Sequence, residues 1–299
     1  MNTELHLLHT RALTVLHALP YTEEEMQLLE KAAMAIDWDK IAPMVEKLQS
    51  PATAEQAKND MYEALGDTDT EHRGLCGVCG FAASMYGLAE KLYPLGVSKD
   101  VLLDTFCALH RMMREYEMQN HHIGFREGFW VWRQCCGQIL RLGTLEFEYL
   151  PELSEREVAL TGMKPHAPIL SVHIPCGCDT SREALNASYA MARTYFAERP
   201  YLCYASGVAP QGIVCHTWLL STALKTLLKE TSGIRRFMED YEIVHHEEEG
   251  KDCIHFLFRV ASDTPFENLP EDTSLRRDVK AYLLSGKGIG TGYGVLKNG

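Results

Sequence analysis

The spacing of apolar residues separates this chain into a helical first part and a second part of strands and helices. Through about residue 143, apolar side chains recur every three or four positions, as Leu5, Leu8, Ala12 and Val15 do in the first stripe. This period is typical of helices with one buried face. The pattern predicts helices over residues 1–19, 22–36, 41–48, 53–65, 78–92, 98–118 and 123–142.

From Gly143 on, the pattern changes to short strands. Residues 145–150 alternate apolar and acidic side chains, which is the period of a half-buried strand. The other elements expected are strands at 169–174, 212–220 and the glycine-rich end, a hairpin of 241–248 with 252–260, and helices at 219–229, 233–240 and 273–285. We therefore expect an α+β protein with an all-helical domain at residues 1–143 and an α/β domain at residues 144–299.

Residues 169–198 combine a strand, a turn with one glycine and a long helix. Pro175 ends the strand because it has no backbone donor. Thr180 and Glu183 have the spacing of a capping box at the start of the helix. A strand that leads through a tight turn into a helix directs several backbone amides at one point, and this suits a phosphate or another anion.

Composition and charge narrow the classes of partner. The chain has 299 residues, 46% hydrophobic and 23% charged, as in soluble globular proteins. Its formal net charge of −12 argues against nucleic acid or an anionic membrane surface as the main partner. No apolar run reaches the roughly 18 residues of a membrane span, and the amphipathic start does not fit a signal peptide. Ten cysteines without a secretion signal are typical of reduced thiols, so we expect a cytoplasmic protein.

Several motifs of the second part resemble those of a bacterial acyltransferase family with a GNAT-like C-terminal domain. Their order and spacing agree over roughly residues 125–299, and the helical first part is similar in character to the domain that accompanies it. The motifs are Leu140-Arg141-Leu142-Gly143-x-Leu145-x-Phe147-Glu148, Val172-His173-Ile174-Pro175-x-Gly177, Cys215-His216-x-Trp218-Leu219-Leu220, Ser232-x-Ile234-x-Arg236-Phe237, and Leu275-Arg276-Arg277 before the glycine-rich end.

This resemblance implies a fold and a reaction. The fold would be a GNAT-like domain whose mixed, mostly antiparallel sheet splays apart at its centre and holds acetyl-CoA or another acyl-CoA in the gap. The reaction would move an acyl group, acetyl in the simplest case, to the amine of a small molecule or a peptide, without a metal ion. The coenzyme pyrophosphate would bind the turn after the central strand, and the residues expected to bind cofactor are Ile174, Pro175, Cys176, Gly177, Cys178, Thr180, Ser181 and Arg182.

The turn departs from the usual signature of the superfamily. That signature begins with Arg or Gln and contains Gly-x-Gly or Gly-x-Ala, whereas Gly177 stands alone here. Asp179 and Glu183 add negative charge that repels a pyrophosphate, and Arg182 offsets part of it. The alternative hypothesis is therefore a GNAT-like module that binds a nucleotide or acyl ligand without catalysis.

Two histidines are the main candidates for the base that an amine acceptor requires. His173 lies on the expected central strand and His216 on its neighbour, and histidine is the side chain best suited to proton transfer near neutral pH. Each position is also compatible with a core histidine whose ring donates to a backbone carbonyl. Glu148 is a weaker candidate, because its place on a strand also suits a solvent-exposed face.

Cys76 and Cys79 have the spacing of a redox or metal-binding pair at the start of a helix. A single pair is weak support for zinc, whereas a helix N-terminus would lower a thiol pKa and make it reactive. We favour a packing role for both residues. A thiol-dependent enzyme that uses Cys76 or Cys176 stays open as a third hypothesis.

Glycines alternate from Gly286 to Gly294 near the C-terminal end. A phosphate-binding glycine loop would be followed by a helix, and none is expected here. We interpret the segment as a flexible stretch beside the acyl site or the domain boundary, leading into a last strand.

Overall fold

The structure is a computed structural model that describes residues 3–199 and 208–297. The chain divides into two compact units, Met1–Arg141 and Leu142–Gly299. The sequence-based boundary after residue 143 lies close to this division, and as a boundary between functional domains it remains a prediction. No helix in the described ranges is both long and apolar enough to cross a membrane.

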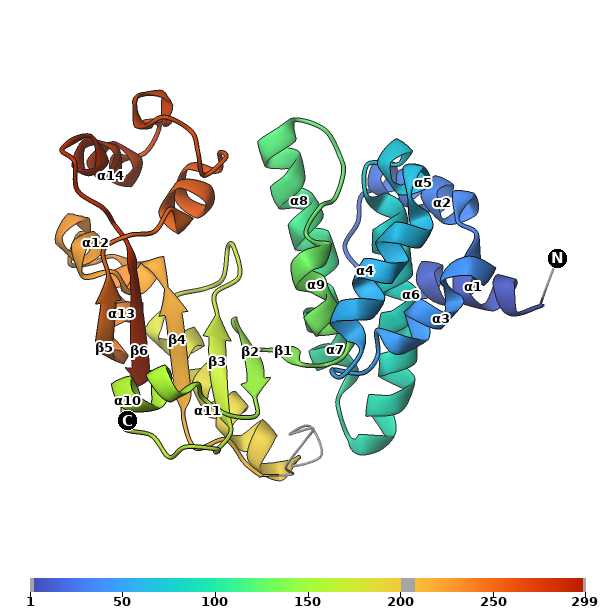
Figure 1. Ribbon diagram of the computed structural model, residues 1–299, viewed down its shortest axis with the longest axis horizontal. Coiled ribbons are helices and arrows are strands. Elements are labelled where there is room, and N and C mark those ends of the chain that lie inside the picture. The colour runs from blue at the N-terminus through green and yellow to red at the C-terminus, as the bar shows by residue number, and fades with distance from the viewer. Residues whose placement is uncertain (1–2, 200–207, 298–299) are drawn as a thin grey trace. The chain divides into compact units, whose positions relative to one another are not determined.

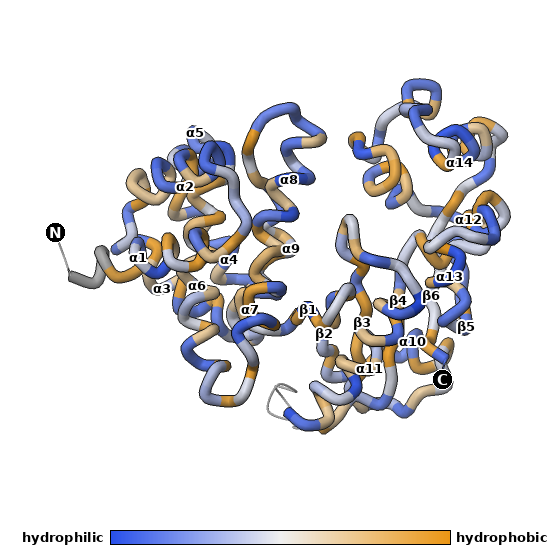
Figure 2. The backbone as a smooth tube through the Cα atoms, turned by 180° about the vertical axis from the view of Figure 1, so that it is seen from behind, coloured by the Kyte–Doolittle hydropathy of each residue, from blue (hydrophilic) through white to orange (hydrophobic). Residues whose placement is uncertain are grey.

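The first unit is built of helices around α6 (Leu75–Leu92). This helix is buried along most of its length because most of its residues are apolar or small. The other helices of the unit are α1 (Thr3–His17), α2 (Glu23–Ala35), α3 (Trp38–Lys47), α4 (Ala54–Leu65), α5 (Asp67–Glu71), η1 (Tyr93–Leu95), α7 (Lys99–Phe106), α8 (Ala108–Asn120) and α9 (Gly128–Cys135). Helices α1, α2, α3, α4 and α9 all contact α6 (Figures 1 and 2). The predicted helical character of the first part is confirmed.

One of the long helices expected in this unit is divided, and another is shorter than expected. The segment 98–118 breaks between α7 and α8. The helix expected over 123–142 is confined to α9, because Gly137 takes a left-handed conformation with φ +71° soon after it. The chain then enters the first strand, β1 (Ile139–Leu142).

The chain forms a six-stranded sheet, whose first strand β1 spans the division between the units and whose other five strands belong to the second unit. Its other strands are β2 (Leu145–Leu150), β3 (Ile169–His173), β4 (Ile213–Thr217), β5 (Tyr241–Glu247) and β6 (Thr291–Leu296). The spatial order is β1-β2-β3-β4-β6-β5 (Figure 1). Strands β3 and β4 are parallel, whereas β2–β3, β4–β6 and β5–β6 are antiparallel pairs. The predicted α+β fold with a mixed, mostly antiparallel sheet is therefore confirmed.

Helices cover the two faces of the sheet unequally. One face packs on α11 (Arg182–Glu198) and α13 (Gly233–Glu239), and the ring of Tyr149 in β2 stacks on Phe196 of α11 with centroids 6.3 Å apart. The opposite face is covered at one end by α10 (Glu155–Thr161). The buried cluster under α10 consists of Leu153, Ile169, Val214 and Tyr293.

The connection between β5 and β6 differs from the predicted hairpin. The arm expected as a strand at 252–260 forms a π-helical turn, η4 (Ile254–Phe258), and β5 pairs with β6 instead. The first and last residues of η4 are four positions apart and both are buried, a spacing that favours a helical turn over a strand. The connection continues through η5 (Phe266–Asn268) and α14 (Ser274–Leu284) before it returns to the sheet.

The strand expected at 212–220 is shorter than predicted. It ends as β4 at Thr217, whose hydroxyl accepts a hydrogen bond from the Leu219 amide at 3.3 Å and starts the 3₁₀ turn η3 (Trp218–Leu220). The helix α12 (Thr222–Leu227) follows. Local capping therefore ends the strand before its apolar run ends.

The glycines of the last strand are packing positions. Gly292 and Gly294 lie in β6, an interior strand, and a Cβ on Gly292 would lie 2.3 Å from the carbonyl oxygen of Leu220. Glycine permits this close approach of two backbones. The expected last strand is confirmed, and the interpretation as a flexible stretch does not hold for β6.

Gly292→Ala should lower the free energy of unfolding by about 1–3 kcal/mol, because the new methyl group meets a backbone oxygen. Gly212→Ala is the matched control at the start of β4, where the added Cβ meets the flexible end of the Met163 side chain at 2.8 Å. Chemical denaturation of the two variants gives the comparison. Equal losses of stability would contradict the tight packing of β6.

Candidate active site

Strands β3 and β4 separate at the centre of the sheet. Their register ends at the pair Ser171 and Val214, and within these two described strands no later pair forms. Beyond that point β3 stays paired with β2 through His173, and β4 stays paired with β6 through Thr217. Each strand keeps one neighbour and leaves the other, and we call the region between the two strands beyond this point the splay.

Cys215 closes the narrow end of the splay. In a continued parallel ladder the carbonyl of Val172 would accept a hydrogen bond from the His216 amide. Where the ladder stops, the thiol of Cys215 donates to that carbonyl, with Sγ 3.4 Å from the oxygen. Burial raises the pKa of Cys215, so the thiol keeps the proton that it donates. The strands thus part without leaving this buried carbonyl unpaired.

Polar side chains gather on one face of the sheet at the open side of the splay. Residues paired across neighbouring strands point the same way, so the register puts Glu148 of β2, His173 of β3 and His216 of β4 on one face. Glu146 lies opposite His173 on the same face and is buried. The two histidines each lie two positions beyond the last pair of β3 with β4. They therefore lie on the two sides of the splay, one on β3 and the other on β4.

Glu148 and His173 form a hydrogen-bonded pair. Nε2 of His173 lies 2.8 Å from Oε2 of Glu148. Glu148 is only 8% exposed, so the solvent-exposed position considered for it is wrong. With an ionised carboxylate, which can only accept, Nε2 of His173 would be the donor in this hydrogen bond. The pair spans two adjacent strands and can orient a histidine base.

His216 has a more open environment. Its side chain is exposed, and Nε2 lies 3.1 Å from Oγ1 of Thr291 on β6. A hydroxyl can donate or accept, so this contact does not fix the tautomer. Sequence reasoning missed Thr291, because only the pairing of β4 with β6 brings the two residues together.

The turn after β3 exposes its backbone. The amide of Cys178 donates to the carbonyl of Pro175 at 3.1 Å, and Gly177 occupies the third position with φ +73°. This is the conformation for which a β-turn requires glycine. Cys176 and Gly177 are exposed, and Ile174 is partly exposed. The single glycine of the turn therefore has a local conformational reason.

Helix α11 is capped by Ser181 and not by Thr180. The Ser181 hydroxyl accepts from the Ala184 amide at 3.3 Å, so the predicted capping box of Thr180 with Glu183 is wrong. Oδ1 of Asp179 accepts from the Ser181 amide at 2.8 Å, and this hydrogen bond lowers the pKa of the Asp179 carboxyl. Asp179 is therefore ionised, and it already binds one of the amides that a phosphate would contact.

Arg182 points toward α13. Its guanidinium donates to Asp240 and, at 3.3 Å, to the carbonyl of Arg236. Its expected role at the phosphate remains a prediction. A different guanidinium reaches the turn: Nη2 of Arg259 lies 3.0 Å from Sγ of Cys176. Sequence reasoning missed Arg259, because its segment was expected to be an arm of a hairpin.

The Cys76 and Cys79 thiols are buried in α6. They donate to backbone carbonyls of α2, Cys76 to Ala32 at 3.7 Å and Cys79 to Leu29 at 3.5 Å. Burial raises the pKa of Cys76 to about 12. Both residues therefore act as packing groups, as favoured from the sequence. Among the residues that the structure describes, no group of three or more His, Cys, Asp or Glu is arranged to hold a metal ion.

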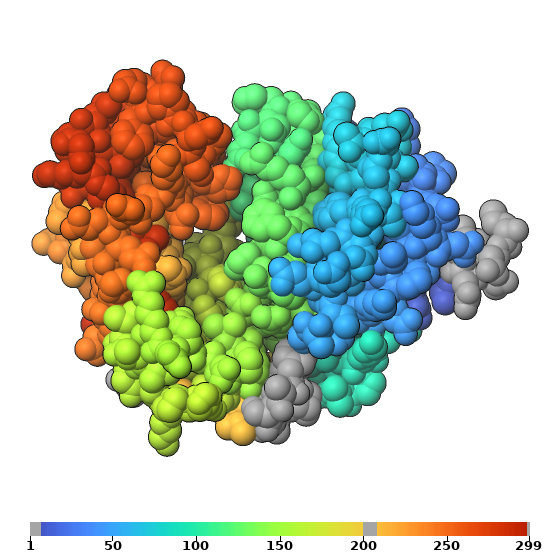
Figure 3. Space-filling view, in the orientation of Figure 1, coloured from blue at the N-terminus to red at the C-terminus, as the bar shows by residue number. Residues whose placement is uncertain are grey.

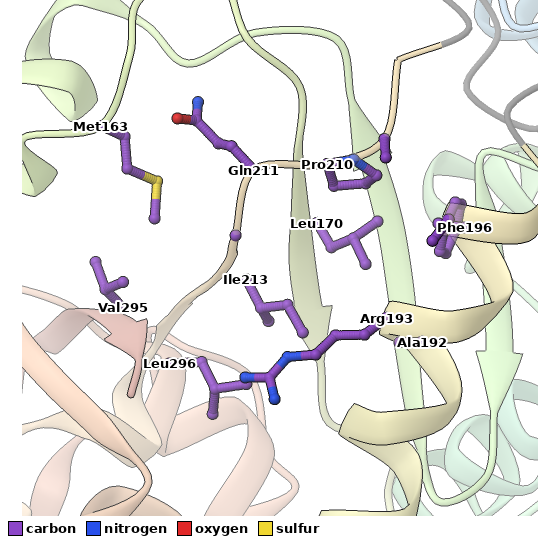
Figure 4. Close-up of a pocket in the computed structure, with 13 residues that line it drawn as sticks. Met163, Leu170, Ala192, Arg193, Phe196, Pro210, Gln211, Ile213, Val295 and Leu296 are labelled. Atoms are coloured by element: carbon purple, nitrogen blue, oxygen red, sulfur yellow. The ribbon is translucent and has the colours of Figure 1, made fainter. Parts of the chain in front are cut away.

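A separate cavity of about 250 Å³ lies at the start of β4, away from the open side of the splay. Its lining includes Leu170, Ile213, Phe196 and Arg193 (Figure 4). None of the predicted catalytic or cofactor-binding residues lines it. The splay, and not this cavity, brings those residues together.

Comparisons with known proteins identify a family for the second part of the chain and solved structures with a similar fold. A family model described as the GNAT-like C-terminal domain matches residues 139–296. The crystal structure of an acyltransferase in complex with decanoyl-CoA and teicoplanin is 21% identical with a TM-score of 0.70, over 93% of this chain and 89% of that one. An acyltransferase structure in complex with decanoyl-CoA is 18% identical with a TM-score of 0.66, over 96% of this chain and 99% of that one. No curated protein sequence matches this chain. At these identities the structures establish a shared fold.

A thiol reagent should label Cys176 first among the described cysteines. Cys176 is exposed, whereas burial raises the pKa of Cys76 to about 12 and that of Cys253 to about 11. Peptide mass spectrometry over a time course with a maleimide measures the order, and protein unfolded in urea gives the reference in which all thiols react. Labelling of Cys76 as fast as Cys176 in the folded protein would contradict the buried packing role of Cys76.

Proposed function

Because this chain belongs to the family of GNAT-like C-terminal domains, we propose that it is an acyltransferase that takes its acyl group from an acyl-CoA. The observation that supports this most directly is the splay between β3 and β4 with the Glu148–His173 pair on one side of it. The acyltransferases in complex with CoA and acyl-CoA that share the fold support the same donor.

The splay suits the pantetheine arm of the coenzyme. The arm carries amides that need hydrogen-bond partners, and backbone groups of β3 and β4 that would pair in a continued ladder are directed into the splay. Just past the end of β3 these belong to Ile174, because the carbonyl of Val172 already accepts from the Cys215 thiol. In this proposal the thioester lies near Cys215 at the apex, and the pyrophosphate lies at the turn of residues 174–182.

His173 is the base in this proposal. Its Nδ1 takes a proton from the acceptor amine, while Glu148 holds Nε2–H and stabilises the ring as it becomes charged. The amine nitrogen forms a bond to the thioester carbonyl carbon, and the carbon–sulfur bond breaks. The sulfur leaves as the thiolate of CoA and takes up a proton. His216 is the second candidate for the base, from the other side.

The proposal also includes the identity of the acyl chain and the class of the acceptor. Acetyl is the simplest donor group, and the neighbour in complex with decanoyl-CoA extends the range to test. We infer an amine acceptor on a small molecule or a peptide, and the complex of one neighbour with teicoplanin favours a small molecule. A cytoplasmic location remains part of this proposal.

A second candidate function is binding without turnover. The observation that favours it is the ionised carboxylate of Asp179. This carboxylate accepts a hydrogen bond from an amide of the turn where a pyrophosphate would bind. A GNAT-like module of this kind would hold an acyl-CoA or another nucleotide and release it unchanged.

Calorimetry and thermal unfolding should detect binding of CoA and of acyl-CoAs from acetyl to decanoyl. A ligand at about 100 times its dissociation constant stabilises the folded state by roughly 2.7 kcal/mol, which shifts the unfolding midpoint measurably. ADP is the control for binding by the nucleotide end alone. No binding by any of the coenzymes would reject the acyltransferase, and of the second candidate only a module that binds another nucleotide would remain.

His173→Ala should lower kcat about 10²- to 10⁴-fold, the usual contribution of a general base, with acyl-CoA affinity unchanged. Glu148→Gln should lower kcat less, because the ring loses its orienting carboxylate but keeps its basic nitrogen.

His166 and Glu152 provide matched controls, because they form an exposed His–Glu contact of the same 2.8 Å length away from the splay. Unchanged turnover in His173→Ala would exclude His173 as the base, and a large loss in His216→Ala would then assign the role to His216.

A further inference from the structure

Arg259 brings a guanidinium group to the turn that follows β3. Its Nη2 lies 3.0 Å from Sγ of Cys176, although the two residues are 83 positions apart in the chain. Cys176 is exposed and Arg259 is partly exposed, so both can be reached from solvent. A ligand that binds this turn therefore meets the guanidinium.

The connection between β5 and β6 holds Arg259 in place. Arg259 follows η4 directly and takes a left-handed conformation with φ +58°. Phe258, the last residue of η4, is buried, and Arg276 of α14 donates from Nε to the carbonyl of Leu257 at 2.9 Å. This connection contributes the orange to red surface at the upper left of Figure 3. Its anchored backbone presents the arginine to a turn that lies far away in the sequence.

The charges at the turn favour a role for Arg259 in binding a phosphate. Asp179 places a negative charge beside the turn, and Arg182 is engaged with Asp240 on α13. A thiol such as that of Cys176 is only a weak hydrogen-bond acceptor. Phosphate oxygens, in contrast, form charge-assisted and often bidentate hydrogen bonds with a guanidinium. A phosphate bound at this turn would therefore be a stronger hydrogen-bond partner for this guanidinium than the Cys176 thiol is.

We propose that Arg259 binds the pyrophosphate of acyl-CoA and supplies the positive charge that overcomes the repulsion from Asp179. It does so from the β5–β6 connection, in place of the Arg or Gln that begins the usual turn signature. This inference rests on the proposed function. It makes Arg259 a residue that recognises the nucleotide end of the donor, without a part in proton transfer.

The test compares two donors in the full chain. Acyl-CoA carries the pyrophosphate, whereas the corresponding S-acyl-pantetheine has the same thioester and no phosphate. Arg259→Ala should raise KM for acyl-CoA about ten- to a hundredfold, the value of a hydrogen bond to a charged group, and leave KM for acyl-pantetheine and both kcat values unchanged. Arg259→Lys should restore part of the affinity. Equal changes with both donors, or no change, would overturn the proposal.

The matched control is Arg193→Ala, which removes another exposed arginine of the same unit, one that lines the separate cavity. It should leave both KM values unchanged. The acyl ester of dephospho-CoA keeps the pyrophosphate and lacks the 3′-phosphate, so the Arg259→Ala effect should persist with it. Loss of the effect would assign the contact to the 3′-phosphate and overturn the proposal.

Cys176→Ala tests whether Arg259 acts only by holding the turn. Removal of the thiol should raise KM for acyl-CoA less than Arg259→Ala does, because in this proposal the guanidinium binds the phosphate and not the thiol when the donor is present. A rise equal to that of Arg259→Ala would overturn the proposal in favour of a structural contact. Calorimetry distinguishes failure of the proposed function from failure of this inference. No binding of acyl-CoA to the wild-type chain would reject the proposed function, whereas equal binding by wild type and Arg259→Ala would reject only the role of Arg259.

Discussion

The end of pairing between β3 and β4 after Ser171 and Val214 is the constraint on which the second unit depends. A sheet divided in this way must be held together elsewhere. Strand β3 stays paired with β2, and β4 stays paired with β6. At the point of division the Cys215 thiol donates a hydrogen bond to the carbonyl of Val172. The contact of Arg182 with Asp240 joins α11, which follows β3, to the end of α13, which precedes β5. It therefore links the two halves of the sheet from the helical side.

The polar residues of the splay follow from the same division. Strand alternation puts Glu148 and His173 on one side of the splay and His216 on the other, where a packed sheet would leave no room for a ligand between them. Because these side chains stand on paired strands and not on loops, their positions are fixed by the sheet, which favours a site that needs accurate geometry. The turn at the end of β3 is local and exposed, and its charge balance depends on groups from other segments.

Local patterns in the sequence were sufficient for the strand, turn and helix of residues 169–198, for the helical first part, and for the two histidines. The cap of α11 moved by one residue because Thr180 and Ser181 both suit that position, and only the backbone decides between them. The burial of Glu148 could not be predicted, since it depends on which strand lies beside β2. The contacts of His216 with Thr291 and of Cys176 with Arg259 join residues 75 and 83 positions apart, and no periodicity or spacing signals them.

Strand β6 lies between β4 and β5 in space, yet it follows both of them in the chain. During synthesis on the ribosome, β4 and β5 therefore emerge earlier, and each waits with an open edge until the long connection and β6 have been made. Open strand edges are the surfaces through which nascent chains associate wrongly. Closure of the sheet is thus a late step, and the strand that completes it brings Gly292 and Gly294 to the contact with Leu220.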